Sequence, residues 1–322
     1  IYMESKMKAL LKLTVLFLIG FTSVNLWADE INSTEIINEK SPGINLFSED
    51  DFWDEDLLDF DFFKSEGKYT LNSYPTIEFQ WGFTKPSTHK DLLSQKFFDA
   101  GSMDFKIGHT KKRAREKYEG IVEIDFDYVF LGRITKDFVS SDEKSSDKVE
   151  LNAWRFGVSS LDGYAYKLGG TGELLLYHSK GMVWTKPEFS SNTASEQLVD
   201  MQKTYDDAFR FGNCFEGGIK YQIVEPISVN VGFERTIVYP RHLFWYWTGS
   251  EIIEGIGHGL VSGFVKEVMK SSPIAAPIVN FLLQNAISYG SFELRKKNMN
   301  WPFDSAMPLL IDNYKVGVSF AF

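Results

Sequence analysis

The sequence predicts an all-β membrane protein, an antiparallel transmembrane β-barrel of eight strands with a helical hairpin inserted before the last strand. Two observations lead to this fold class. From residue 75 onward, apolar and polar residues alternate in eight separate stretches, as expected for strands whose two faces meet different surroundings. The segments between the alternating stretches are by turns long and short, as in barrels that keep short turns at one end. Ten or twelve strands, or a secreted soluble β-protein, would show a similar alternation.

Eight alternating stretches follow one another along the chain. They cover residues 77–83, 103–107, 122–130, 154–158, 164–176, 209–223, 227–233 and 314–322. The connections between them are 85–102 (long), 110–118 (short), 132–148 (long), 159–163 (tight), 178–208 (long), 225–226 (tight) and 239–312 (very long). Asp162-Gly163 is the turn signal of the first tight connection. Long and short therefore alternate at all seven positions.

The last stretch alternates most strictly. One face carries Tyr314, Val316, Val318, Phe320 and Phe322, and the other carries Lys315, Gly317, Ser319 and Ala321. A terminal strand of this form that ends in phenylalanine resembles the C-terminal signature of Gram-negative outer-membrane β-barrel proteins. The resemblance implies that the five apolar residues form the assembly signal that the barrel-assembly machinery reads. It also implies a location in the outer membrane, in contact with lipid and lipopolysaccharide. We expect this strand to pair with residues 77–83 and close the barrel.

The N-terminal part of the chain has two segments. Residues 1–28 have a short cationic region, an apolar stretch from Leu13 to Phe21 and a cleavage site after Ala28, which predicts a cleaved signal peptide. An uncleaved anchor is the alternative, although the apolar stretch is short for a span of about 20 residues. Residues 29–68 are an acidic periplasmic tail, with thirteen carboxylates against Lys40 and Lys64 up to residue 66. The tail is interpreted as a solvated linker or as a docking segment for a periplasmic partner. The barrel domain then covers residues 69–322.

Charged residues occupy the face opposite the apolar one. Assigned to the lumen by this alternation are Glu78, Asp104, Lys106, Glu123, Asp125, Asp127, Arg155, Glu216, Lys220, Glu234 and Lys315. An eight-stranded barrel is wide enough only for its own side chains, so these charges should pair in a salt-bridge network. The alternative for the three carboxylates at 123, 125 and 127 is a cation or proton site.

The region before the last strand breaks the alternation. Arg235, Tyr239, Trp245 and Trp247 are predicted as interfacial anchors, because aromatic and long cationic side chains favour the headgroup region. Apolar residues at about 250–290 recur at helical spacing, and Pro273 and Pro277 divide them into two helices. We expect this hairpin to fill the barrel mouth or to lie in the interface of the outer leaflet.

The sequence limits the functions of the protein. The net charge of −10 excludes a basic surface for nucleic acid. A single cysteine and five unclustered histidines predict no metal site and no cofactor. A structural or ligand-binding protein of the cell surface, or a plugged conduit for a small or apolar solute, is expected. A lipid hydrolase using His178 and Ser179 is the alternative, although adjacent strand residues point to opposite faces.

Overall fold

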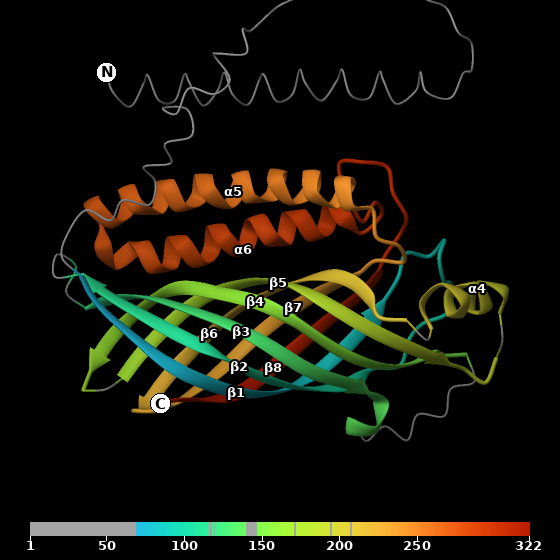
Figure 1. Cartoon of the computed structure of the whole chain (residues 1–322), viewed down its shortest axis with the longest axis horizontal. Helices are drawn as coiled ribbons and strands as arrows, with labels where there is room; N and C mark the ends of the chain where they lie inside the picture. The colour runs from blue at the N-terminus through green and yellow to red at the C-terminus, as the bar shows by residue number, and fades with distance from the viewer. Residues whose placement is uncertain are drawn as a thin grey trace, which may run out of the picture. The chain divides into compact units, whose positions relative to one another are not determined.

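The described part of the chain forms a closed antiparallel barrel. The computed structural model describes residues 69–115, 118, 120–139, 147–170, 172–193, 195–206 and 208–322. Each strand pairs with the next, and β8 pairs with β1 (Figure 1). The strands are β1 (Tyr69–Ser87), β2 (Ala100–Arg115), β3 (Ile121–Thr135), β4 (Glu150–Gly169), β5 (Gly172–Ser190), β6 (Arg210–Val224), β7 (Ile227–Val238) and β8 (Leu309–Ala321). The eight-stranded fold class is thereby confirmed. The predicted signal peptide and acidic tail lie outside the described residues.

The closing strand has the predicted partner. Phe320 lies opposite Ile77, Val318 opposite Phe79 and Tyr314 opposite Phe83. The long and short connections also alternate as expected, so the tight turns gather at one end of the barrel and the long segments at the other. We call these the short-turn end and the long-loop end.

One predicted turn is wrong. Residues 159–163 do not turn but lie within β4, which continues to Gly169. The reversal falls at Gly169 and Gly170, whose φ angles of 95° and 58° favour glycine. Gly163 instead allows close approach of the neighbouring strand, because a Cβ there would lie 2.1 Å from the carbonyl oxygen of Leu176. The strand count is unchanged because this reversal divides the predicted stretch 164–176 between β4 and β5.

The two faces of β3 are the reverse of those predicted. Glu123, Asp125 and Asp127 lie on the outer wall and not in the lumen, and they share the outward face with the exposed Val129 and Leu131. The residues that point inward and are buried are Val122, Ile124, Phe126, Tyr128 and Phe130. These apolar and aromatic residues pack in the lumen, where large apolar side chains are as acceptable as charged pairs. Alternation alone does not tell which face of such a strand points inward.

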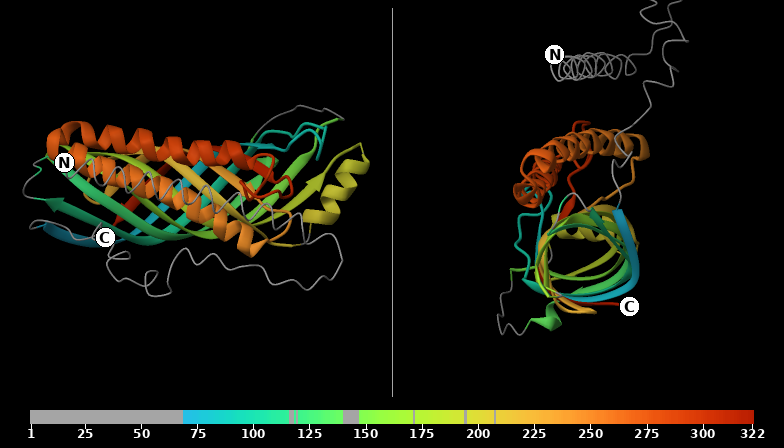
Figure 2. Two further views of the ribbon diagram at one scale, coloured as in Figure 1. Left: turned by 90° about the horizontal axis from the view of Figure 1, so that it is seen from above. Right: turned by 90° about the vertical axis from the view of Figure 1, so that its left-hand side faces the viewer.

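The helical hairpin lies against the outside of the barrel. It consists of α5 (Phe244–Ser271), the short η3 (Pro273–Ala275) and α6 (Ala276–Arg295). Both helices run alongside the strands, outside the ring that the strands form (Figures 1 and 2). The hairpin tip reaches the short-turn end, where the Tyr166 hydroxyl donates to the carbonyl of Ile274 at 2.5 Å. The expectation that the hairpin fills the mouth or lies in the outer interface is therefore wrong.

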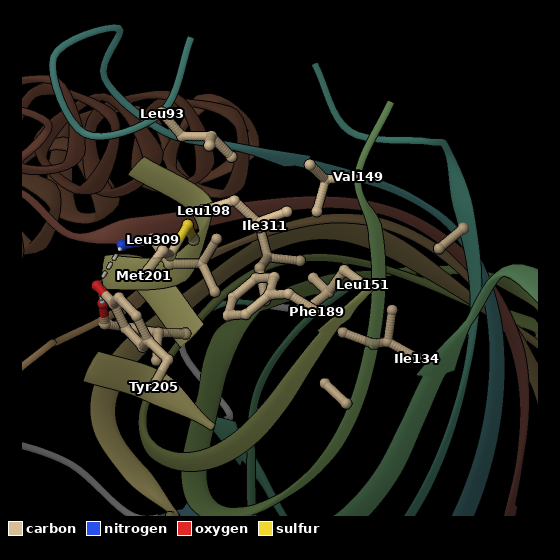
Figure 3. Close-up of a cluster of buried hydrophobic side chains, with 13 residues drawn as sticks. Leu93, Ile134, Val149, Leu151, Phe189, Leu198, Met201, Tyr205, Leu309 and Ile311 are labelled. Carbon is tan, nitrogen blue, oxygen red and sulfur yellow. Dashed lines mark hydrogen bonds between the residues drawn. The ribbon is translucent and has the colours of Figure 1, made fainter. Parts of the chain in front are cut away.

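The long-loop end of the lumen is closed by an apolar cluster (Figure 3). A short 3-10 turn, η2 (Lys136–Phe138), follows β3, and α4 (Glu196–Tyr205) lies between β5 and β6. From α4, Leu198, Met201 and Tyr205 point into this cluster. The Tyr205 hydroxyl accepts from the backbone N–H of Leu309 at 3.1 Å. Burial raises the pKa of Tyr205 above its ordinary value, so the hydroxyl stays protonated and brings no charge into the apolar cluster.

Candidate site on the outer barrel wall

The lumen contains a balanced network of charges. Eight of the eleven residues assigned to it by sequence point inward and are buried: Glu78, Asp104, Lys106, Arg155, Glu216, Glu234 and Lys315, with Lys220 at its margin. Arg155 binds Asp104 at 2.7 Å and Glu234 at 2.5 Å. Lys315 reaches the same two carboxylates at 2.6 and 2.5 Å. Four acids and four bases thus neutralise one another.

A second half of the network joins Glu78 and Glu216. Lys106 lies 3.1 Å from Glu78 and 3.2 Å from Glu216, and Lys220 lies 2.6 Å from Glu78. The Tyr177 hydroxyl donates to Glu216 at 2.6 Å. With the apolar cluster at the long-loop end, these side chains close the middle and the long-loop end of the barrel interior. A pocket of about 310 Å³ remains inside the short-turn end, lined in part by Thr76, Lys112 and Phe126.

The three carboxylates that β3 turns outward have partners of their own. Lys111 donates to Asp127 at 3.1 Å, and Arg113 pairs with Glu123 and Asp125. The Ser160 hydroxyl also donates to Asp127, at 2.7 Å. Asp127 keeps 52% of its side-chain surface exposed. These residues form a polar patch on the outer wall, nearer the short-turn end.

The predicted interfacial anchors have different surroundings. Trp245 is 79% exposed at the start of α5. Tyr239 is buried, and its hydroxyl donates to Asn213 at 3.1 Å; the Trp247 indole N–H donates to the same oxygen at 3.1 Å. Arg235 is 3.1 Å from Glu293 of α6 and lies over the rings of Tyr289 and Phe292. Three of the four residues therefore attach the hairpin to the wall.

A buried ionic cluster lies between the hairpin and the wall. Lys180 of β5 points outward and lies 2.8 Å from Glu251 and 2.9 Å from Glu254, both on α5. Arg295, at the end of α6, lies 2.9 and 3.0 Å from the same two carboxylates. Glu254 and Arg295 are only 4% and 2% exposed. Paired and buried in this way, the charges fix both helices to one position on the barrel.

Histidines extend this cluster toward the short-turn end. The ring of His178 on β5 stacks on that of His258 on α5, with centroids 5.2 Å apart. His258 Nδ1 lies 2.5 Å from Gln284 Oε1, whereas Nε2 faces both Ser288, at 3.4 Å, and Glu254, at 3.5 Å. A hydrolytic triad needs its nucleophile and its acid at opposite ring nitrogens. This histidine is therefore placed as a connector between helices.

His178 and Ser179 do not form a nucleophile–base pair. His178 faces the hairpin, whereas Ser179 points into the lumen, 2.9 Å from the Ser159 hydroxyl and 3.2 Å from that of Tyr128. Opposite orientation follows from the period of two in a strand. The hydrolase alternative loses the residues on which it depended.

A groove of about 660 Å³ opens on the outer wall beside α5. Two adjacent rows of paired residues form its floor across β2 to β5. The first row is apolar and consists of Ile107, Val129, Val158 and Met182. The next row toward the short-turn end is polar and contributes Asp127, Ser160 and Lys180. Trp247 and Glu251 of α5 form the side of the groove. The groove thus offers an apolar surface that ends at the row of Asp127, Ser160 and Lys180, which we call the polar step.

Sequence reasoning missed the residues that join the hairpin to the barrel. Glu251, Glu254 and His258 recur at intervals of three and four on a helix that is otherwise mostly apolar, and this spacing was the available signal. Their partners Lys180 and Arg295 come from distant segments, which no local pattern connects. In the described ranges, no three His, Cys, Asp or Glu side chains are grouped to hold a metal ion. None of the helices in these ranges combines the length and the apolar character of a membrane span.

Comparison with known proteins gives structural likeness only. No family model and no curated protein matches the sequence. Among solved structures, Neisserial surface protein A is similar with 7% identity and a TM-score of 0.33, over 79% of this chain and 99% of that one. Ail, the attachment invasion locus protein of Yersinia pestis, has 8% identity and a TM-score of 0.26, over 80% of this chain and 99% of that one. Neither value supports a conclusion about activity.

Proposed function

We propose that this outer-membrane β-barrel does not conduct solutes and instead binds its ligand from the lipid phase, at the outer wall beside the hairpin. The observation that carries the proposal is the polarity of the hairpin. Along most of its length the polar residues face the barrel and are buried, among them Glu254, Asn280, Gln284, Ser288 and Arg295, whereas Glu267 and Lys270 near the tip are exposed. Its exposed face is apolar and consists largely of Ile252, Ile256, Leu260, Phe264, Ile278, Leu282 and Tyr289.

This polarity is the inverse of that of a helix in water, which turns its apolar face to the core. It suits a helix pair surrounded by lipid, because Lys180 of the barrel wall and Arg295 of α6 neutralise the carboxylates that α5 buries. The hairpin packs on β4 to β6, and the strands away from it carry an exposed apolar belt that includes Phe79, Trp81, Phe105, Leu131 and Val316. An outward apolar belt is the lipid-contacting feature of a transmembrane barrel. The hairpin then extends the lipid-facing surface.

We include in this proposal the expectations from the sequence about export, assembly and surroundings. Export by the predicted signal peptide and assembly through the row from Tyr314 to Phe322 would place the short turns in the periplasm. Lipid and lipopolysaccharide would then surround the belt. The acidic tail would lie on the periplasmic side, where a partner could reach it.

Two measurements test the proposal. Purified protein in planar bilayers should give no stepwise conductance, because the ionic network and the apolar cluster block the lumen at its middle and its long-loop end. A fluorophore at Leu282→Cys should be quenched by doxyl-labelled lipids and resist aqueous iodide. The barrel belt provides the lipid-side reference at Val231→Cys, and α4 provides the aqueous reference at Asp200→Cys. Unitary conductance, or iodide quenching at position 282 equal to that at position 200, would refute the proposal.

A further inference from the structure

The groove beside α5 has a polarity that fits one class of lipid. Its apolar row lies toward the long-loop end, and its polar row lies toward the short-turn end. If the short turns are periplasmic, the polar step faces the periplasmic leaflet. A molecule bound there would have its chains directed toward the membrane centre and its headgroup at Asp127 and Ser160. That is the orientation of a phospholipid of the periplasmic leaflet.

The charges around the polar step indicate the headgroup. Lys180 is already neutralised by Glu251 and Glu254. The open part of the step contains four carboxylates, Glu123, Asp125, Asp127 and Asp162, against Lys111 and Arg113. An acidic surplus attracts an ammonium group and repels a headgroup of net negative charge. Lys111, 44% exposed and 3.1 Å from Asp127, supplies a cation for the lipid phosphate beside the carboxylate for the amine.

We propose that the groove is a binding site for a zwitterionic, amine-bearing phospholipid, with its acyl chains on the row from Ile107 to Met182 and its ammonium group at Asp127. This inference rests on the proposed function, since it takes the ligand from the lipid phase. It adds the chemical class of the ligand and the residue that selects it. The Ser160 hydroxyl, which donates to Asp127 at 2.7 Å, holds the carboxylate in place.

The test uses the full chain in nanodiscs of equal parts phosphatidylethanolamine and phosphatidylglycerol, followed by mild release and native mass spectrometry. The wild type should retain phosphatidylethanolamine over phosphatidylglycerol by about tenfold, the ratio expected from one charge-assisted hydrogen bond. Asp127→Asn should reduce this ratio to about one. Asp200→Asn, the same change on the exposed face of α4, should leave it unchanged.

A second variant tests the groove itself. Val158→Trp fills the apolar floor and should abolish the retained lipid. Val231→Trp, the same substitution at an exposed position of β7 away from the groove, should retain it. Heat-modifiable migration on gels confirms that each variant is folded. Equal retention by the two tryptophan variants, or a ratio that Asp127→Asn does not change, would overturn the inference. Either result would overturn the lipid-binding inference alone. The proposed function would still stand if lipid quenches the fluorophore at position 282 and no conductance is seen.

Discussion

Arg155 is the residue on which most of the lumen network depends. Its guanidinium binds Asp104 and Glu234 with two contacts each, between 2.5 and 3.0 Å. Removing one member of a buried charged network leaves its partners without compensation, which costs more than the pair itself contributes. Lys315 alone then has to balance both carboxylates.

We predict that Arg155→Met destabilises the barrel by about 3–5 kcal/mol. Urea unfolding in detergent micelles, followed by tryptophan fluorescence, measures the change. Arg133→Met is the matched control, because Arg133 points outward from β3 and lies over the ring of Trp154. If the two variants lose similar amounts of unfolding free energy, the buried network contributes no more to stability than an outward-facing arginine.

Gly217 sets the distance between the hairpin and the wall. It lies on β6 beneath α6, where a Cβ would come within 2.1 Å of Asn285 Oδ1. The Asn285 side chain donates to the carbonyl of Phe281 at 2.8 Å. A larger residue at 217 must therefore displace α6 from the barrel.

At the scale of the element, Gly217→Leu should loosen α6 and leave the strands paired. Overpacking costs about 1–3 kcal/mol, so hydrogen exchange in α6 should rise by about ten- to a hundredfold. Gly259→Leu on α5 is the control, because no atom lies within 4 Å of a Cβ at that position. Unchanged exchange in α6 would mean that the helix does not depend on this contact.

The sequence of α4 contains an N-cap residue and apolar residues at helical spacing, although no helix is predicted there. Ser195 caps the helix by accepting from the backbone N–H of Leu198 at 3.2 Å, and Leu198, Met201 and Tyr205 follow at helical spacing. Both features are visible in the sequence. The alternation nevertheless predicts one long connection over residues 178–208, because a short helix between two strands does not alter a period of two.

For the molecule as a whole, the rate of barrel assembly should depend on the outward-facing residues of β8. Tyr314 and Val316 are more than half exposed, and Phe322 is 68% exposed, so their side chains contribute little to the packed interior. We predict that Phe322→Ala slows assembly of the barrel in cells and leaves the stability of the assembled protein within about 0.5 kcal/mol of the wild type.

Pulse-chase labelling with heat-modifiable migration measures that assembly rate. Phe138→Ala, at an exposed position after β3, controls for the loss of an aromatic surface. If Phe322→Ala assembles at the rate of the control, these residues do not act as an assembly signal. A large loss of stability would instead assign the residue to packing.

The sequence by itself determined the eight strands, the alternation of long and short connections, and the pairing of residues 314–320 with 77–83. These features depend on a period of two and on chain lengths, which are local properties. Only the tertiary structure decided which face of β3 points inward, because apolar side chains suit both lipid and a packed lumen. It also decided that the hairpin lies along the wall. That position depends on charges at 180, 251, 254 and 295, which come from three distant segments and meet only in the folded chain.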